Sequence, residues 1–131
     1  MNDDLCKEGP ARTILIIDDN EHLRQFSAAV LERAGHIVIQ AGDAREAMEI
    51  WSRDQVAISV IIADIHLPGQ TGPELAREFL DEKPDLKIVF TSGSLPEVVN
   101  EATYAMKDAR FLPKPYTAKV MLDAVREVLK S

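Results

Sequence analysis

Three aspartates come directly after short apolar runs, at the points where strands of a sheet would end. Asp18 and Asp19 follow the run Ile14–Ile17, and Asp64 follows the run Val56–Ala63. Ionised carboxylates about 4 Å apart repel by roughly 4 kcal/mol per pair at an effective dielectric of about 20, so a proton or a cation must lie between them. A hard divalent cation that prefers oxygen ligands, Mg²⁺ above all, suits such a cluster.

Two more polar side chains follow apolar runs later in the chain. Thr91 closes the run Leu86–Phe90, and Lys114 stands two residues beyond Leu112, directly before Pro115. A hydroxyl and an ammonium group can therefore reach the same edge of a parallel sheet as the aspartates. Phosphoryl transfer to a carboxylate needs such a set: a nucleophilic aspartate, a metal that neutralises charge, and donors for the remaining phosphoryl oxygens.

Short β-branched runs alternate with longer stretches that have a helical apolar period, which predicts a βα unit repeated five times. The strands are expected at Ile14–Ile17, Ile37–Ile39, Val56–Ala63, Leu86–Phe90 and Ala109–Leu112. Several runs are apolar on both faces, which suits a parallel sheet with helices on both sides. The expected fold is α/β, a flavodoxin-like doubly wound sheet of order 2-1-3-4-5, with its ligand site beyond the carboxyl ends of strands one and three.

Several residues predict where the helices begin and end. Gly35 follows an apolar stripe of helical period and suits a left-handed C-cap. The segments Asp43–Glu46 and Ser94–Glu97 resemble capping boxes, which place helix starts near residues 44 and 95. The third helix is expected after Pro73, and Thr117 is the expected N-cap of the last helix.

Length and composition predict one domain and exclude some partners. The 131 residues suit a polar tail over residues 1–11 and one folded domain over residues 12–131. A net charge of −7 disfavours binding to nucleic acid or to an anionic membrane. The single cysteine, Cys6, excludes an internal disulfide, and residues 1–10 lack the apolar core of a signal peptide, so we expect a cytoplasmic protein.

Along residues 12–130 the chain resembles the receiver domains of two-component response regulators, the CheY-like superfamily. The resemblance rests on residues that occur in the order of the family's motifs: Asp18, Asp19, Asp64, the turn Pro68–Gly69, Thr91 and Lys114. Each of these residues alone is a weak signal, but the ordered set on matching strand ends is specific.

The resemblance implies a phosphorylation site that works with Mg²⁺. Asp64 would accept the phosphoryl group from a phosphohistidine on a sensor histidine kinase or a histidine phosphotransfer protein. Asp18, Asp19, Asp64 and the backbone carbonyl of His66 would hold the ion, and Lys114 would pair with the phosphoryl group. The domain would then be a signalling switch that catalyses its own phosphorylation and dephosphorylation, and not an enzyme that acts on other molecules.

The resemblance also implies how the signal leaves the site. Thr91 would move its hydroxyl toward the phosphoryl group, and Phe111 would change rotamer in response. The Lys114–Pro115 bond would be cis. The face made by the fourth helix, the fifth strand and the fifth helix would be the output surface, and it is a possible homodimer interface.

Three other functions compete with this interpretation. A haloacid-dehalogenase-like phosphatase also uses an aspartate nucleophile and Mg²⁺, but its signature has a second aspartate two residues after the first, where this chain has Asn20 after Asp18. An interaction module that works without phosphorylation would keep the fold and lose the chemistry. A flavin-binding protein would need a phosphate-binding loop, and the chain has no obvious Gly-rich one.

Four further residues have ordinary structural explanations. His22 and His36 lack the spacing of metal ligands, and surface positions are expected for both. Met48 and Trp51 lie on the expected second helix, where packing is the expected role of both side chains.

Overall fold

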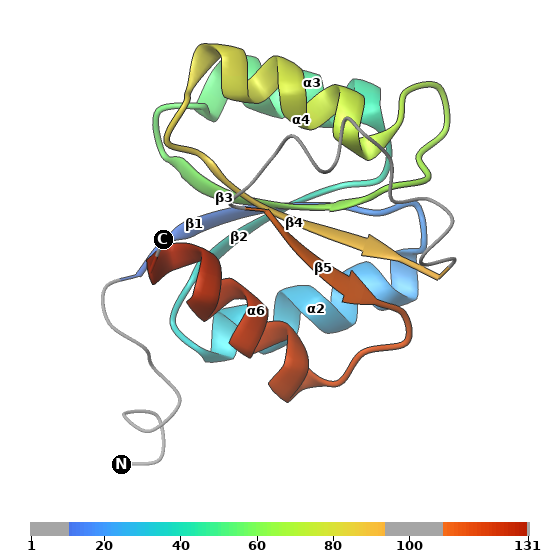
Figure 1. Ribbon diagram of the computed structural model, residues 1–131, viewed down its shortest axis with the longest axis vertical. Coiled ribbons are helices and arrows are strands. Elements are labelled where there is room, and N and C mark those ends of the chain that lie inside the picture. The colour runs from blue at the N-terminus through green and yellow to red at the C-terminus, as the bar shows by residue number, and fades with distance from the viewer. Residues whose placement is uncertain (1–10, 94–108, 131) are drawn as a thin grey trace.

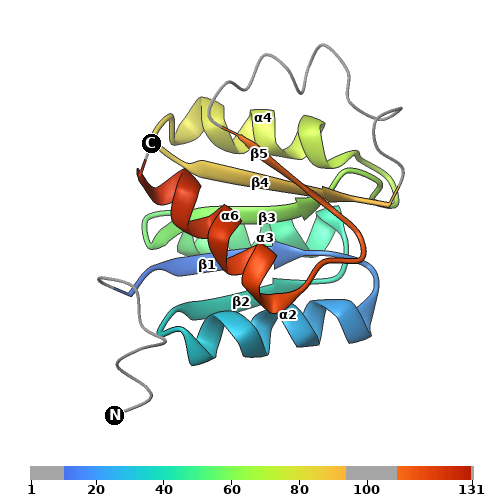
Figure 2. The ribbon, with the colours of Figure 1, turned by 60° about the horizontal axis from the view of Figure 1, so that its bottom comes forward.

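The computed structural model describes residues 11–93 and 109–130, and its centre is a parallel five-stranded sheet. The strands are β1 (Thr13–Ile17), β2 (Ile37–Ala41), β3 (Ile58–Asp64), β4 (Lys87–Ser92) and β5 (Arg110–Pro113). Their order is β2-β1-β3-β4-β5, which can be followed from bottom to top in Figure 2. This order confirms the predicted topology and makes β1 and β3 neighbours.

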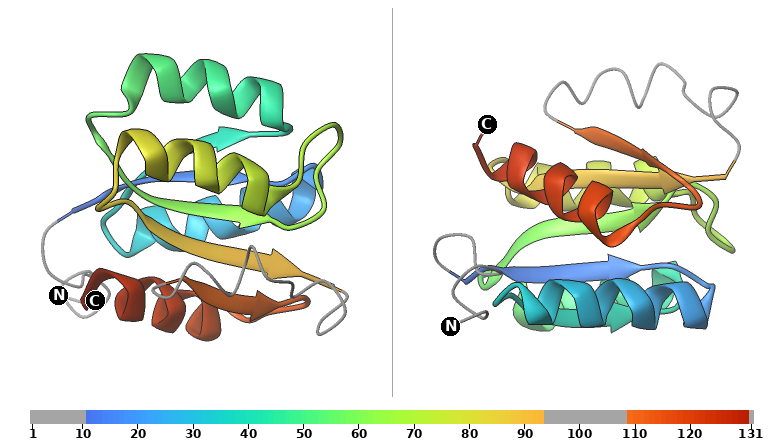
Figure 3. Two further views of the ribbon diagram at one scale, coloured as in Figure 1. Left: turned by 45° about the horizontal axis from the view of Figure 1, so that its top comes forward. Right: turned by 90° about the horizontal axis from the view of Figure 1, so that it is seen from below.

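Helices cover both faces of the sheet. The described helices are α2 (Glu21–Arg33), α3 (Ala44–Asp54), α4 (Gly72–Glu82) and α6 (Ala118–Lys130). Figure 1 shows α3 and α4 on one face and α2 and α6 on the other, and the two views of Figure 3 show each face in turn. Across the described ranges, no helix combines the length and the apolar character that a membrane crossing requires.

The two faces bury separate apolar clusters because successive side chains of a strand point to opposite sides. Leu15 and Ile17 of β1 belong to the cluster that contains Trp51 of α3. Ile14 and Ile16 belong to the cluster that contains residues of α2 and α6. The double burial of β1 explains why its sequence is a continuous apolar run.

Strand β3 begins two residues later than predicted. Val56 was expected to open the strand, but its side chain is 92% exposed and the strand starts at Ile58. The ammonium group of Lys83 donates to the backbone carbonyls of Gln55 and Val56. The C-cap residue of α4 therefore binds these carbonyls just before the ladder of the sheet begins.

The helix boundaries predicted at Gly35 and Asp43 are confirmed, the second with a different bonding pattern. Gly35 has a φ of 102°, the left-handed conformation expected after α2. Asp43 is the N-cap of α3 and accepts a hydrogen bond from the N–H of Glu46. The Glu46 carboxylate, however, accepts from the N–H of Gly42 and not from that of Asp43, so the predicted capping box is only half formed.

The reciprocal capping box of the described helices lies at α4, where it was not predicted. The Thr71 hydroxyl accepts from the N–H of Glu74, and the Glu74 carboxylate accepts from the N–H of Thr71. The Thr117 hydroxyl accepts from the N–H of Val120, as expected of the N-cap of α6. The helix predicted near residue 95, with its Ser94–Glu97 box, lies outside the described residues.

His36 does not lie on the surface, and this corrects the prediction. Its side chain is 8% exposed, and its Nδ1 atom accepts a hydrogen bond from the backbone N–H of Arg12. Burial lowers the pKa of His36, and the positive charge of Arg12 lowers it further. His22 is exposed, as predicted.

Trp51 packs in the interior, but Met48 does not. The Trp51 ring stacks on Phe79 of α4 with 4.3 Å between the ring centroids, and its indole N–H donates to Glu82. Met48 is 43% exposed, so a packing role describes it only in part. The stacked rings fix α3 against α4 on one face of the sheet.

Candidate functional site

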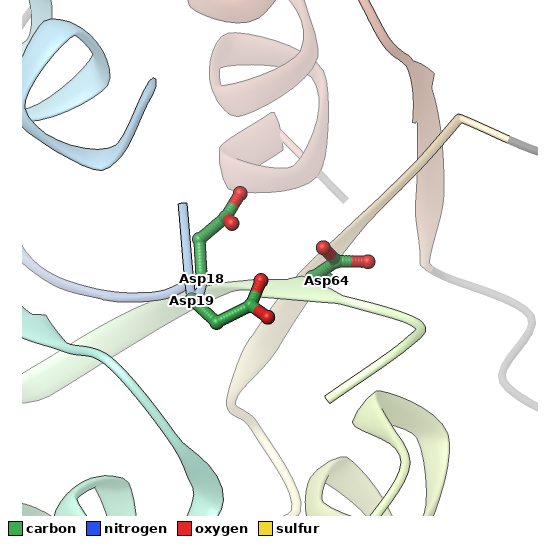
Figure 4. A group of neighbouring side chains, drawn as sticks. All are labelled: Asp18, Asp19 and Asp64. Carbon is green, nitrogen blue, oxygen red and sulfur yellow. The ribbon is translucent and has the colours of Figure 1, made fainter. Parts of the chain in front are cut away.

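Three carboxylates meet at the carboxyl edge of the sheet, as the sequence predicts. Asp18 and Asp19 follow β1, and Asp64 is the last residue of the neighbouring strand β3. Figure 4 shows the three side chains gathered at these strand ends. One oxygen from each carboxylate lies within 4.8 Å of the other two. Asp18 and Asp64 are buried, with 3% and 7% of their surface exposed, whereas Asp19 is exposed.

Hydrogen bonds fix Asp18 from several directions. Its backbone N–H donates to the carbonyl of Ala41 at the end of β2. Its Oδ1 atom accepts from the N–H of Asn20 at 2.8 Å, and its own carbonyl accepts from the Arg24 guanidinium at 2.7 Å. The corner between β1 and α2 is therefore held by β2, by the N-cap of α2 and by a side chain of α2.

Asp64 has a different partner for each carboxylate oxygen. Its Oδ1 atom accepts from the backbone N–H of His66 at 2.9 Å, and its Oδ2 atom lies 2.7 Å from the ammonium nitrogen of Lys114. Thr91 lies opposite Asp64 in the pairing of β3 with β4. Gly72, the first residue of α4, packs so close that a Cβ atom there would lie 2.3 Å from the Asp64 carbonyl oxygen. Asp64 is therefore fixed both at its side chain and at its backbone.

Lys114 bridges two of the three carboxylates. Its ammonium nitrogen lies 2.7 Å from Oδ2 of Asp64 and 3.0 Å from Oδ2 of Asp18. Its backbone N–H donates to the carbonyl of Ser92, and its peptide bond to Pro115 is cis. Burial lowers the pKa of Lys114, but the hydrogen bonds and the negative charges of Asp64 and Asp18 outweigh burial, so the pKa is raised above its ordinary value of 10.5.

The side chains of this cluster fit a divalent cation. Asp18, Asp19 and Asp64 offer only oxygen ligands, which is the donor type that Mg²⁺ prefers. The one ammonium group of Lys114 cannot neutralise three carboxylates, and it pairs with the two buried ones. The exposed Asp19 gives the cluster access to solvent. The contribution of the His66 carbonyl to such a site stays a prediction, because the contact described for His66 is that of its N–H.

Thr91 and Phe111 lie near the site on the last two strands. Thr91 is buried within β4, one strand away from Asp64. Phe111 of β5 is half-buried and lies beside Phe90 of β4, with ring centroids 5.8 Å apart. These positions suit the roles that the sequence predicts for both residues, and the movements themselves stay predictions.

Sequence reasoning missed three residues that support the site. Arg24 binds the Asp18 carbonyl, and the Tyr116 and Ser27 hydroxyls lie 2.8 Å apart, which joins the loop of Lys114 to α2. Burial raises the pKa of the Tyr116 phenol. Arg24 lies six residues after Asp18, and Tyr116 lies two after Lys114, so closeness in the chain was the available signal.

Comparison with known proteins gives concordant results. The family model described as the response regulator receiver domain matches residues 14–126. The response regulator receiver protein CpdR of Brucella abortus (strain 2308) is 30% identical over 118 residues, which cover 90% of this chain and 97% of CpdR. A solved receiver-domain structure from Clostridium thermocellum superposes with a TM-score of 0.79 at 27% identity, over 91% of this chain and 94% of the other.

The relatives differ greatly in length. The sensor kinase CckA of Brucella abortus (strain 2308) is also 30% identical over 118 residues, which are 90% of this chain but only 12% of CckA. The same fold therefore occurs as nearly the whole of one relative and as a small part of another. The family match over most of the described domain agrees with the sheet order and with the acidic cluster. The chain belongs to the response regulator receiver domain family of two-component signalling systems.

Proposed function

We propose that this receiver domain accepts a phosphoryl group from a phosphohistidine onto the carboxylate of Asp64, in a reaction that requires Mg²⁺. The observation that carries the proposal is the position of Asp64: its carboxylate is buried beside Asp18 and Asp19 and is held by Lys114. The reaction forms a bond between an Asp64 oxygen and phosphorus and breaks the bond between phosphorus and the histidine nitrogen. The leaving nitrogen takes the electron pair of that bond.

In this proposal Asp18, Asp19, Asp64 and the carbonyl of His66 hold the ion. Bound Mg²⁺ would supply positive charge that offsets the negative charge of the phosphoryl oxygens. Lys114 contributes a second positive charge beside Asp64, where its ammonium group already lies within hydrogen-bond distance of Oδ2. The N–H of His66 orients the carboxylate through Oδ1. Fixed donors of this kind favour the transition state because they need little rearrangement during the reaction.

The phosphoryl group would then shift the domain between two conformations. It adds a charge of about −1.5 to −2 at the end of β3 and gives the Thr91 hydroxyl and Lys114 a new partner. Movement of Thr91 toward the site would leave room beside β4 that the half-buried Phe111 can enter. The change would reach the face formed by β5, α6 and the helix predicted from residue 95, which is also a possible homodimer interface. Hydrolysis of the acyl phosphate by the domain itself would restore the first state.

The proposed donor is a sensor histidine kinase or a histidine phosphotransfer protein. The likeness to a sensor kinase, CckA, and to a response regulator receiver protein, CpdR, supports a partner of this kind. The net charge of −7 opposes direct contact with the phosphate backbone of nucleic acid. A protein partner that presents a phosphohistidine is therefore the partner that the site chemistry fits.

The proposal is tested by intact-protein mass spectrometry after incubation with a small acyl phosphate and Mg²⁺. We expect one added phosphoryl group on the parent protein, none without Mg²⁺, and none on Asp64→Asn. Asp85→Asn is the matched control, because Asp85 is exposed and lies away from the cluster. It should be modified like the parent. Equal modification of Asp64→Asn and the parent would show that the acceptor is another group.

A further inference from the structure

Arg24 of α2 reaches back to the corner that carries Asp18 and Asp19. Its Nη1 atom donates to the carbonyl oxygen of Asp18 at 2.7 Å. Its Nε atom donates to Oε1 of Gln40 on β2 at 3.1 Å, so the guanidinium joins α2 to the ends of two strands. The side chain is half-buried. The Asp18 contact has the short length of a hydrogen bond from a charged donor.

The Asp18 carbonyl matters because it belongs to the peptide group that leads into Asp19. The peptide is planar, so a bond that fixes its oxygen also fixes the direction in which the chain enters Asp19. The Asp18 side chain has its own restraints, from Asn20 and Lys114. Asp19 is exposed, and the direction of its carboxylate depends on the backbone of this corner.

We infer that Arg24 is a positioning residue of the metal site: by holding the Asp18 carbonyl, it directs the Asp19 carboxylate toward Asp64. The inference rests on the proposed Mg²⁺ site and names a residue outside the set of groups that would touch the ion or the phosphoryl group. Groups that orient metal ligands commonly change the metal affinity by tenfold or more when they are removed.

The positive charge of Arg24 makes the inference easy to distinguish from a simple charge effect. A cation beside an acidic cluster repels Mg²⁺, so loss of the Arg24 charge alone would tighten Mg²⁺ binding. Loss of a positioning contact has the opposite effect, because Asp19 then samples directions that do not face Asp64. The sign of the change in affinity therefore separates the two roles.

The test is isothermal titration of Mg²⁺ into the parent protein and its variants. We expect Arg24→Gln to bind Mg²⁺ about tenfold more weakly than the parent. Arg33→Gln is the matched control: Arg33 lies in the last turn of the same helix, is exposed, and loses the same charge. Its affinity should equal that of the parent or be slightly higher. Arg24→Lys should lie between Arg24→Gln and the parent, because lysine keeps the charge but lacks the planar fork that spans both acceptors.

A second variant keeps the test informative if Arg24→Gln does not fold, which circular dichroism would show. Gln40→Ala leaves Arg24 in place and removes one of the two acceptors that orient it, so we expect about threefold weaker binding. Where Arg24→Gln folds, the double variant with Arg24→Gln and Gln40→Ala should bind Mg²⁺ no more weakly than Arg24→Gln alone. Both changes act through the one contact between Arg24 and the Asp18 carbonyl.

Three results would overturn the inference. The first is Mg²⁺ affinity in folded Arg24→Gln that equals or exceeds that of the parent. The second is an equal loss of Mg²⁺ affinity in the control Arg33→Gln, which would separate the effect from the Asp18 contact. The third, decisive where Arg24→Gln does not fold, is parental affinity in Gln40→Ala. A parent protein that binds no Mg²⁺ would remove the proposed metal site and this inference together, whereas the first three results would leave the proposed function intact.

Discussion

The ammonium nitrogen of Lys114 lies 2.7 Å from Oδ2 of Asp64, although the two residues are 50 positions apart in the chain. Asp18 shares the same ammonium group at 3.0 Å. Because these interactions raise the pKa of Lys114, they stabilise the folded state fully below pH 10.5 and less as the pH rises through the folded pKa. Lys114 thus serves as the counter-ion of the two buried carboxylates, and in the proposed reaction it serves the phosphoryl group.

Replacement of this counter-ion should destabilise the protein in the absence of Mg²⁺. We predict that Lys114→Met lowers the free energy of unfolding by about 3 kcal/mol, because two buried carboxylates then repel each other without compensation. Added Mg²⁺ should restore part of the loss. Urea unfolding with and without Mg²⁺ measures both effects.

Lys119→Met is the control for this experiment. Lys119 pairs with Asp123 on the surface of α6, and its side chain is 84% exposed, so the expected loss is below about 0.5 kcal/mol. Equal losses in the two variants would show that Lys114 is not the counter-ion of a buried cluster.

Gly72 should tolerate no side chain, because α4 begins against the backbone of Asp64. A Cβ atom at Gly72 would lie 2.3 Å from the Asp64 carbonyl oxygen, and backbone atoms cannot rotate away as a side chain can. We predict that Gly72→Ala costs about 1–3 kcal/mol of stability and slows phosphorylation, since the strain is relieved by a shift of Asp64 or of α4. Gly93→Ala is the control, because its Cβ would meet nothing within 4 Å. Parental stability and parental phosphorylation in Gly72→Ala would contradict the described packing.

His36 should make the folded state sensitive to mild acid. The pKa of His36 is lowered in the folded state, so below pH 6.5 the unfolded chain takes up a proton that the folded protein resists, and stability falls. The loss should stop growing once the pH is below the folded pKa. His36→Asn keeps an acceptor for the Arg12 N–H and removes the titration, so it should lose less stability than the parent between about pH 8 and about pH 5.

Urea unfolding across this pH range gives the comparison, and His22→Asn is the control on an exposed histidine. The stability of His22→Asn should depend on pH as that of the parent does. A parental pH dependence in His36→Asn would exclude His36 as the cause.

The Tyr116 and Ser27 hydroxyls should contribute to stability through one shared hydrogen bond, so the losses of the two single variants should not add. Ser27 is fully buried, so Tyr116→Phe leaves its hydroxyl without the partner that lies 2.8 Å away. We predict a loss of about 1 kcal/mol for Tyr116→Phe or Ser27→Ala, and no larger loss for the double variant. A double-mutant cycle in urea measures the coupling. Losses that add fully would show that the two hydroxyls act independently.

The sheet and the acidic cluster could be predicted because they depend on local patterns and one general rule. The apolar runs mark the strands, and the carboxyl ends of neighbouring parallel strands meet at one edge. Asp18 and Asp64 therefore had to approach each other once β1 and β3 were predicted as neighbours. Few other arrangements of five βα units satisfy the same rule.

The features that the sequence did not reveal depend on tertiary partners. Lys83 binds the carbonyls just before β3, and no local pattern indicates that the C-cap residue of α4 reaches them. The ring of the buried His36 accepts from the N–H of Arg12, a residue 24 positions earlier. Nothing in the sequence around Arg24 or Tyr116 indicates a tertiary contact. Their support of the site follows only from the positions of Asp18 and Ser27 in space.

The identity of the modified residue tests the central claim most directly. Borohydride reduces an aspartyl phosphate to homoserine and leaves free carboxylates unchanged, so peptide sequencing after phosphorylation and reduction locates the acceptor. We predict homoserine at position 64 in the parent protein treated with phosphodonor and Mg²⁺, and unmodified aspartate at positions 18 and 19. Homoserine at position 18 or 19, or at none of the three, would contradict the assignment of Asp64 as the phosphoacceptor.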